Sequence, residues 1–309
     1  MASGRSGRTR FPVAAAARSS LRRYPRDLAR SLRTPGVAPA RGEIPALRGI
    51  HEHAWAASWL GHAGVLLRVG GSTIVCDPVL SRRIGVRIGP IVLGPERLVP
   101  PPLAADRLPP IDLVLISHAH YDHLDRPTLA RLASGRTTVV TARRTRRLIP
   151  RGFGRVVELD WGQSEVFAGV RICAIEPTHW GARAGVDRRR GFNSYLIRSD
   201  EQRILFAGDT ARTDAFATLG PVEMAIFGIG AYDPWEHAHA TPEQVWDMFV
   251  SCAGRRLLPV HHSTFELSEE HVDEPLERLL TAAGADRGRV IITAPGQLWT
   301  PQGTARLAS

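Results

Sequence analysis

Four potential metal ligands occupy a run of six positions in this 309-residue chain, directly after an apolar segment. Residues 111–117 (IDLVLIS) have the composition of a buried strand, and His118, Ala119, His120, Tyr121, Asp122 and His123 follow them. Imidazole and carboxylate side chains together suit zinc and neighbouring divalent transition metals. Hydrophobic packing does not explain so many polar side chains at the end of a buried strand. The chain is therefore predicted to fold around a metal site that begins at this strand end.

Three further candidate ligands stand in the same local context, each just past the carboxyl end of a predicted strand. If these strands lie in facing sheets, their ends can meet at one rim. Together with the first cluster they supply seven ligands, enough for two metal ions that share a bridging group. Taken singly, the aspartate also fits a turn or a helix N-cap. The three are His179 after residues 170–175, Asp209 after residues 203–207 and His261 after residues 256–260.

From about residue 54 the sequence alternates short apolar runs with Gly, Pro and Asp, a pattern typical of strands and turns. Helices are predicted at residues 127–133, at 241–252 with Thr241 as N-cap and Pro at N1, and at 269–283. No domain boundary is evident beyond residue 54, so we expect one layered domain of mixed α and β structure. The predicted strands are residues 57–60, 65–69, 73–76, 111–117, 137–141, 156–159, 170–175, 194–198, 203–207, 224–228, 256–260 and 290–293.

Composition excludes several classes of protein. No apolar stretch approaches the roughly 18 residues of a membrane-spanning helix, and the run at residues 13–17 is too short for the core of a signal peptide. Cys76, Cys173 and Cys252 are odd in number and far apart, so neither a disulfide framework nor a thiolate zinc cluster is indicated. We expect buried thiols and a cytoplasmic protein. All 40 basic residues are arginine, which we attribute to GC-rich coding and a bacterial source.

The type and order of the ligands resemble the metallo-β-lactamase superfamily. More narrowly, the chain resembles the N-acylphosphatidylethanolamine-hydrolysing phospholipase D family over roughly residues 54–300. The resemblance implies an α+β fold, an αβ/βα four-layer sandwich with a two-metal site at the edge of its inner sheets. The motifs that carry it are Trp59-Leu60-Gly61-His62-Ala63, Asp77-Pro78, Pro110-Ile111-Asp112, residues 117–125 (SHAHYDHLD), Glu158-Leu159-Asp160-Trp161, His179-Trp180, Gly208-Asp209-Thr210, residues 230–234 (GAYDP) and residues 261–265 (HHSTF).

The resemblance also implies a role for each candidate. Asp122 would accept a proton from the attacking water, and His239 would contact the substrate or its leaving group. His261 is preferred to the adjacent His262 because it occupies the histidine position of the family's H-x-x-T-F ending. His62 stays open between a supporting and a structural role. The implied ligands are His118, His120 and His179 for one metal and Asp122, His123 and His261 for the second, with Asp209 bridging them.

A dinuclear site of this kind implies a hydrolase. A water between two divalent ions loses a proton near neutral pH, and the resulting hydroxide would attack a phosphorus or carbonyl centre. Zinc is the expected metal, with iron or manganese as alternatives. The closer resemblance favours a phosphodiester substrate, an N-acylphosphatidylethanolamine-like phospholipid. A sugar-phosphate lactonase or a general phosphodiesterase of the same superfamily is the alternative, because the metal motif does not separate these activities.

A basic amino-terminal arm lies outside the resemblance. Residues 1–50 contain eleven arginines against Asp27 and Glu43, whereas the rest of the chain is nearly neutral. We expect residues 1–45 to be an arm and linker, with a short basic amphipathic segment at 21–32, and residues 46–309 to be the hydrolase domain. The arm suits an anionic membrane surface and would hold the protein peripherally at the inner face. Nucleic-acid binding through the arm is the alternative of another class.

Overall fold

The computed structural model describes residues 45–305, apart from residues 184–186, 188 and 201, together with Pro25, Ala29 and Ser31. Most of the predicted basic arm, including nearly all of the amphipathic segment at residues 21–32, lies outside the described residues.

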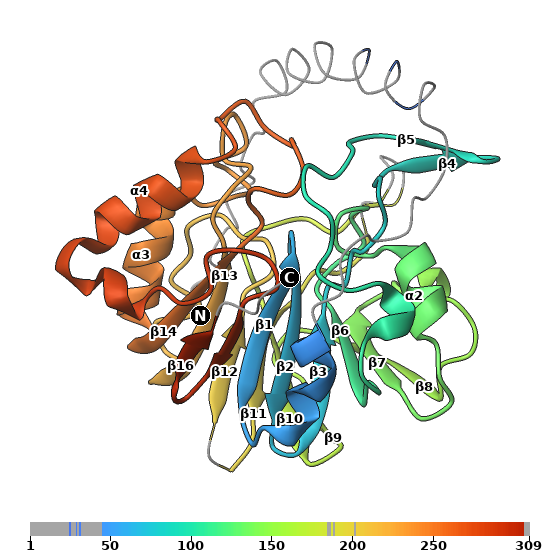
Figure 1. Ribbon diagram of the computed structural model, residues 1–309, viewed down its shortest axis with the longest axis horizontal. Helices are drawn as coiled ribbons and strands as arrows, with labels where there is room; N and C mark the ends of the chain where they lie inside the picture. The colour runs from blue at the N-terminus through green and yellow to red at the C-terminus, as the bar shows by residue number, and fades with distance from the viewer. Residues whose placement is uncertain are drawn as a thin grey trace, which may run out of the picture.

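Two sheets form the centre of this domain, as Figure 1 shows. The larger sheet contains, in spatial order, β16 (Gly303–Ala305), β15 (Leu298–Thr300), β1 (Ala56–Gly61), β2 (Gly64–Val69), β3 (Ser72–Cys76), β6 (Leu113–Ile116), β7 (Thr138–Ala142) and β8 (Arg155–Leu159). The smaller sheet contains β14 (Gly254–Val260), β13 (Val222–Gly228), β12 (Arg203–Phe206), β11 (Ser194–Arg198), β10 (Val170–Ile175) and β9 (Ser164–Phe167). A separate hairpin pairs β4 (Val86–Ile88) with β5 (Ile91–Leu93).

Helices cover the outer faces of both sheets. Side chains such as Trp59 and Leu67 of the larger sheet and Phe206 of the smaller sheet share one buried core. A second core packs η1 (Pro45–Glu52) and α2 (Arg126–Leu132) on the larger sheet, and a third packs α3 (Pro242–Ser251) and α4 (Glu274–Ala283) on the smaller sheet. Short 3-10 helices lie at η2 (Ala105–Arg107), η3 (Arg146–Leu148) and η4 (Gly284–Arg289). This layering confirms the αβ/βα sandwich expected from the sequence.

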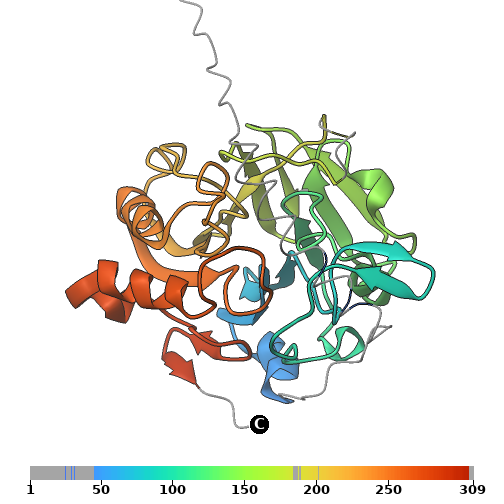
Figure 2. The same ribbon diagram turned by 90° about the horizontal axis from the view of Figure 1, so that it is seen from above.

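Strand direction brings several strand ends to one edge of the fold. β3, β6 and β7 are parallel, and β1 runs the same way because β2 is antiparallel to both β1 and β3. In the smaller sheet β12, β13 and β14 are parallel, and β10 runs with them because β11 is antiparallel to both β10 and β12. The loops that follow these strands gather at the upper edge in Figure 1, which Figure 2 shows from above.

Where the structure departs from the predicted elements, the causes are local. Residues 290–293 do not form the predicted strand, because they make a single bridge and Ile292 adopts a φ of 52°, outside the extended region. The last long helix begins at Glu274 rather than at residue 269, because Glu270 accepts backbone N–H groups from another loop. The short strands β4, β5, β9, β15 and β16 were not predicted, since three or four residues carry too little alternation.

A buried polar contact joins the two sheets directly below the cluster of histidines. Tyr195 of β11 donates its hydroxyl to the carbonyl oxygen of Ile116, the last residue of β6, over 2.9 Å. Asn193 donates its backbone N–H to the carbonyl of Ser117 over 2.9 Å and its side-chain amide to the Tyr195 oxygen over 3.2 Å. The end of β6 is thereby held against the smaller sheet at the residues that precede His118.

We expect Tyr195→Phe to lower the free energy of unfolding by about 1 kcal/mol, because a buried carbonyl loses its hydroxyl donor. Urea unfolding measures the change. Tyr232→Phe is the matched control, since the Tyr232 hydroxyl donates to Glu274, whose carboxylate can bond to water instead. Equal losses in the two variants would contradict a special contribution of the contact between the sheets.

Candidate metal centre

The candidate ligands lie in four overlapping groups at this edge, and the two larger groups, of four side chains each, both draw on the two sheets. The larger sheet supplies a run of ligands in the loop after β6. The smaller sheet supplies one ligand after each of three strands. In chain order they are His118, His120, Asp122 and His123 after β6, His179 after β10, Asp209 after β12 and His261 after β14.

The first group consists of His118, His120, His179 and Asp209. His120 Nδ1 lies 2.8 Å from His118 Nε2 and 3.4 Å from His179 Nε2. Both of these Nε2 atoms are 3.7 Å from Asp209 Oδ2. Three nitrogen atoms and one carboxylate oxygen thus face one another, a donor set that fits zinc and similar divalent metals.

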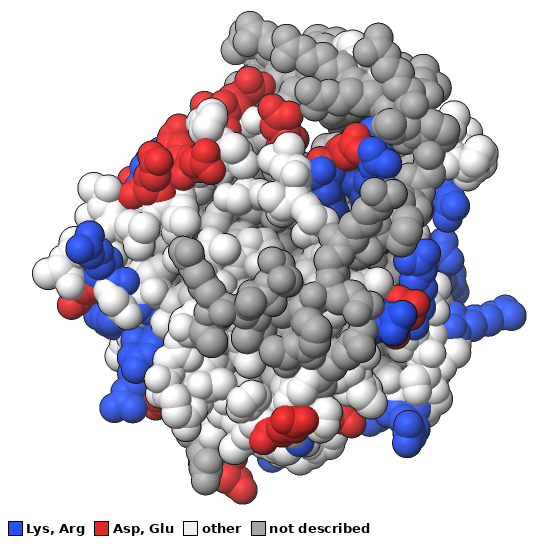
Figure 3. Space-filling view, viewed as in Figure 1, with Lys and Arg blue, Asp and Glu red and all other residues white. Residues whose placement is uncertain are grey.

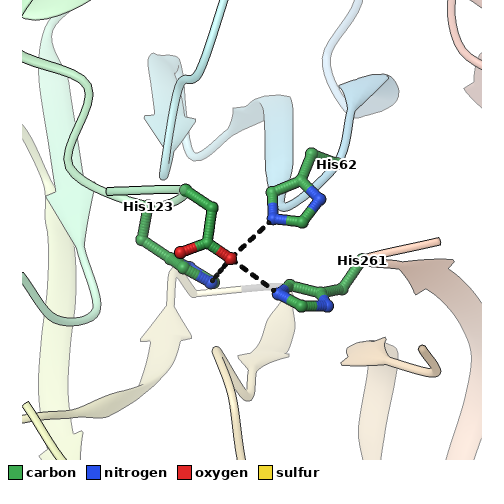
Figure 4. Close-up of side chains that lie close together, drawn as sticks. His62, His123 and His261 are labelled. Carbon is green, nitrogen blue, oxygen red and sulfur yellow. Dashed lines mark hydrogen bonds and ion pairs between the residues drawn. The ribbon is translucent and has the colours of Figure 1, made fainter. Parts of the chain in front are cut away.

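The second group contains the predicted ligands Asp122, His123 and His261, and also His62. Figure 4 shows three imidazoles turned toward one oxygen atom, Oδ2 of Asp122. The Nε2 atoms of His62, His261 and His123 lie 3.0, 3.2 and 3.6 Å from it. The Asp122 side chain is 16% exposed, whereas the three imidazoles are at most 1% exposed. This carboxylate is therefore the part of the group that solvent reaches.

Asp209 lies between the two groups. Its Oδ2 is 3.0 Å from His123 Nε2 and 3.4 Å from His261 Nε2, in addition to its contacts in the first group. Both Asp209 Oδ2 and His123 Nε2 are buried without a hydrogen-bond partner of acceptable geometry among the described residues. Buried polar atoms are rarely left unpaired in this way. The residues present therefore fit a divalent cation on each side of Asp209.

The electrostatics of the cluster agree with this fit. Burial lowers the pKa of His179 to about 3 and that of His120 to about 4, so both imidazoles are neutral at neutral pH and can offer a lone pair. Burial alone would raise the pKa of Asp209 and Asp122, but neighbouring imidazoles, above all His123, bring both well below the ordinary value. Burial alone would lower the pKa of His123 and His261, but the neighbouring carboxylates, above all Asp209, raise both. The cluster thus combines neutral imidazoles with imidazolium–carboxylate pairs, in which a divalent metal would take the place of the protons.

Contacts behind the cluster orient its nitrogen atoms. His123 donates Nδ1–H to Asp77 over 2.6 Å, and Ser117 donates its hydroxyl and its backbone N–H to the same carboxylate. His118 Nδ1 lies 2.9 Å from the Ser117 oxygen, to which it can donate. His179 Nδ1 bonds to the carbonyl oxygen of Ala238 over 2.9 Å. Because Nδ1 carries the proton in each case, Nε2 presents its lone pair to the centre.

His239 lies at the open side of the cluster, just before α3. Its Nδ1 is 3.9 Å from Asp209 Oδ2, and its side chain is 16% exposed. Burial lowers its pKa to about 3, so it is a neutral imidazole. His262, by contrast, packs its ring on Trp59 at 4.6 Å and is absent from both ligand groups. Of the two adjacent histidines, it is His261 that lies among the other candidate ligands.

Comparison with known proteins identifies the family. A family model of the β-lactamase superfamily domain matches residues 72–262, more than half of the chain. The chain belongs to this superfamily. The solved structure of a possible metal-dependent hydrolase from Veillonella parvula superposes with a TM-score of 0.64 at 15% identity, and the match covers 79% of this chain and 98% of that one.

Two relatives resemble this β-lactamase superfamily member in sequence. An uncharacterised protein of Mycobacterium tuberculosis is 35% identical over 272 residues, which are 82% of this chain and 70% of the relative. N-acyl-phosphatidylethanolamine-hydrolyzing phospholipase D 1 of Caenorhabditis elegans is 30% identical over 245 residues, 72% of this chain and 68% of the relative. The resemblance drawn from the sequence motifs is thereby confirmed.

Superfamily membership and the clustered histidines and aspartates make the chain a metal-dependent hydrolase. Among the described residues, no helix combines the length and the apolar character needed to cross a membrane.

Two side chains at the site have contacts that the sequence did not reveal. Asp77 follows β3 in an Asp-Pro pair, and only the pairing of β3 with β6 shows that it reaches His123. His62 lies in the turn between β1 and β2, far from the other candidates in sequence. In the sequence, both residues stand in short motifs at predicted strand ends. These motifs indicate where each residue lies along the chain but not which side chain it contacts.

We expect Asp77→Asn to weaken metal binding about 10–100-fold, because the neutral amide no longer raises the basicity of the His123 imidazole. Elemental analysis after dialysis against graded chelator measures the retained metal. Asp112→Asn is the matched control, because Asp112 accepts the N–H of Thr73 from the same pair of strands, away from the site. Retention of metal by Asp77→Asn at the level of the unaltered chain would refute the orienting role.

Proposed function

We propose that the chain is a dinuclear metal-dependent phosphodiesterase that hydrolyses an N-acylphosphatidylethanolamine-like phospholipid. The observation that carries the proposal is the position of Asp209. Its Oδ2 lies 3.7 Å or less from imidazole nitrogen atoms of both ligand groups. A carboxylate placed in this way can serve two cations at once.

The sequence relatives support a lipid substrate. The name of the Caenorhabditis elegans relative states that it hydrolyses N-acyl-phosphatidylethanolamine, and the match covers more than two thirds of each chain. The family model matches residues 72–262, and this range contains the candidate ligands, which lie between residues 118 and 261.

A cavity that reaches the ligand loop after β6 has side chains suited to a phospholipid. It measures about 470 Å³ and reaches Tyr121, which lies between the candidate ligands His120 and Asp122. Basic side chains, drawn in blue, gather along the right-hand side of the molecule in Figure 3, where Figure 1 labels β4 and α2. Residues of β4 and α2 line the cavity, whose wall combines basic with aliphatic side chains. An anionic phosphate and apolar chains can both find partners there. The lining includes Arg87, Arg126 and Arg183 together with Ile84, Val86, Val92 and Leu148.

Each side chain has a task in the proposed reaction. The seven candidate ligands would hold two divalent cations, zinc by preference, which supply Lewis acidity and lower the pKa of bound water. Asp122 presents the most exposed carboxylate of the cluster and would accept the proton of the attacking water. His239 would donate an N–H from the open side to the phosphate or its leaving group. Asp77 and Ser117 keep the imidazoles in the orientation that these tasks require.

We expect Asp209→Asn to lower hydrolysis of N-acylphosphatidylethanolamine in detergent micelles by at least about 10²-fold, because it removes the charge common to both groups. Mass spectrometry of the released N-acylethanolamine measures turnover, and elemental analysis measures the metal content of the same sample. Asp247→Asn is the control, since Asp247 lies on α3, away from the ligand groups.

Three outcomes decide between the activities. Lipid hydrolysis that survives Asp209→Asn, or that persists after the metal has been removed, would refute the proposal. Turnover of bis(p-nitrophenyl) phosphate without turnover of the lipid would restrict the function to that of a general phosphodiesterase. Turnover of a sugar-phosphate lactone in place of both would favour the lactonase.

The role of His239 has a separate test. His239→Ala should lower kcat/KM for the lipid about 10–100-fold while the metal content stays unchanged, because His239 belongs to neither of the two four-residue ligand groups and its Nδ1 is 3.9 Å from Asp209 Oδ2. Kinetics and elemental analysis on the same preparation separate the two effects. His271→Ala, an exposed histidine, is the control. Loss of metal in His239→Ala would show that the residue is a ligand instead.

A further inference from the structure

His62 is the one member of the second group to which neither the sequence nor the family resemblance gives a role. It is 1% exposed and lies in the turn between β1 and β2 with a φ of 52°. Non-glycine residues adopt this left-handed conformation only where the surrounding structure holds them in it. The neighbours of the turn therefore have to supply that restraint.

Three backbone contacts hold His62 in this turn. Its N–H donates to Thr264 Oγ1 over 2.7 Å, and its carbonyl oxygen accepts the indole N–H of Trp59 over 2.6 Å. The same carbonyl accepts the backbone N–H of His261 over 2.9 Å. The turn of the larger sheet is thus bonded to the loop of the smaller sheet that carries a candidate ligand.

Ring packing and a contact to Asp122 also fix the side-chain orientation of His62. Its ring centre lies 4.1 Å from that of His261 and 5.1 Å from that of Phe265, so aromatic groups restrict its rotation. In this orientation Nε2 approaches Asp122 Oδ2 to 3.0 Å. His123 and His261 lie within 4 Å of both Asp122 and Asp209, whereas the described contacts of His62 reach Asp122 alone. His62 therefore contacts a ligand without sharing the space around Asp209.

Other candidate ligands are likewise oriented by hydrogen bonds to groups outside the ligand set. His118, His123 and His179 each bond on the side away from the centre to a group that is not a ligand: Ser117, Asp77 and the carbonyl of Ala238. Among the described residues, the hydrogen bonds of Asp122 go only to His261, itself a candidate ligand, and to His62. His62 occupies for Asp122 the place that those groups occupy for the histidines.

We propose that His62 is a positioning residue of the second metal position, where it donates Nε2–H to Asp122 Oδ2 and so fixes the direction of that carboxylate. The inference rests on the proposed dinuclear function and adds a residue to it. A second consequence comes from the backbone contacts, because one turn then sets the positions of both Asp122 and His261.

Two substitutions separate a hydrogen-bond donor from a metal ligand. His62→Ala removes the imidazole. His62→Gln places an amide N–H near the position of Nε2, so it can still donate to Asp122, but a side-chain amide is a poor ligand for zinc-like metals. A positioning role therefore predicts rescue by glutamine, whereas a direct ligand role predicts none. Thermal melts of both variants show whether they fold.

The experiment is a titration of chelator-treated full-length protein with Co²⁺, followed by visible absorption and by elemental analysis. We expect the first equivalent to bind with unchanged affinity in both variants. The second equivalent should bind about 10–100-fold more weakly in His62→Ala and within a few-fold of the unaltered chain in His62→Gln. His271→Ala should bind both equivalents normally.

The outcomes distinguish this inference from the proposed function. Unchanged binding of the second equivalent by a folded His62→Ala would overturn the positioning role and leave the dinuclear function standing. A loss in His62→Gln as large as that in His62→Ala would also overturn it and would assign His62 as a ligand. Binding of a single equivalent by the unaltered chain would overturn the inference and the dinuclear function together.

Discussion

A buried cluster of imidazoles and carboxylates around Asp209 is the constraint on which the structure depends. Asp209 Oδ2 is surrounded by imidazole nitrogen atoms and yet has no hydrogen-bond partner among the described residues. A buried carboxylate costs free energy unless positive charge lies close to it. Asp209 and its neighbours raise the pKa of His123 against the effect of burial, so a protonated imidazole can supply this charge until a cation replaces it.

The fold meets this constraint through strand direction. β1, β3 and β6 run in one direction within the larger sheet, and β10, β12 and β14 run in one direction within the smaller sheet. The loops that follow both sets of strands meet at the same edge of the fold. The cores between and outside the sheets fix the strands, and Tyr195 bonds the end of β6 across to the smaller sheet. Rigid strand ends give the short ligand loops little freedom, which suits a site in which four imidazole nitrogen atoms lie 3.0 to 3.7 Å from Asp209 Oδ2.

The sequence predicted those features whose signal is local. The run from His118 to His123 is contiguous, and most buried strands are long enough to show an apolar pattern, so both are evident from the sequence alone. The roles of Asp77 and His62 depend on contacts between segments distant in sequence, 46 and 60 residues apart, and no local pattern encodes such a pairing. The predicted strand at residues 290–293 was wrong because an apolar pattern does not reveal backbone conformation. Ile292 adopts a φ of 52°, which interrupts the extended chain.

The distribution of the ligands over both sheets has a consequence for the biogenesis of the protein. Neither of the two ligand groups lies entirely within the amino-terminal or the carboxyl-terminal half of the chain. During translation the histidines after β6 leave the ribosome well before Asp209 and His261, so they have no ligand partner from the smaller sheet when they first appear. Stable metal binding therefore follows the synthesis of both sheets. A metal-bound centre indicates that translation and sheet assembly are complete.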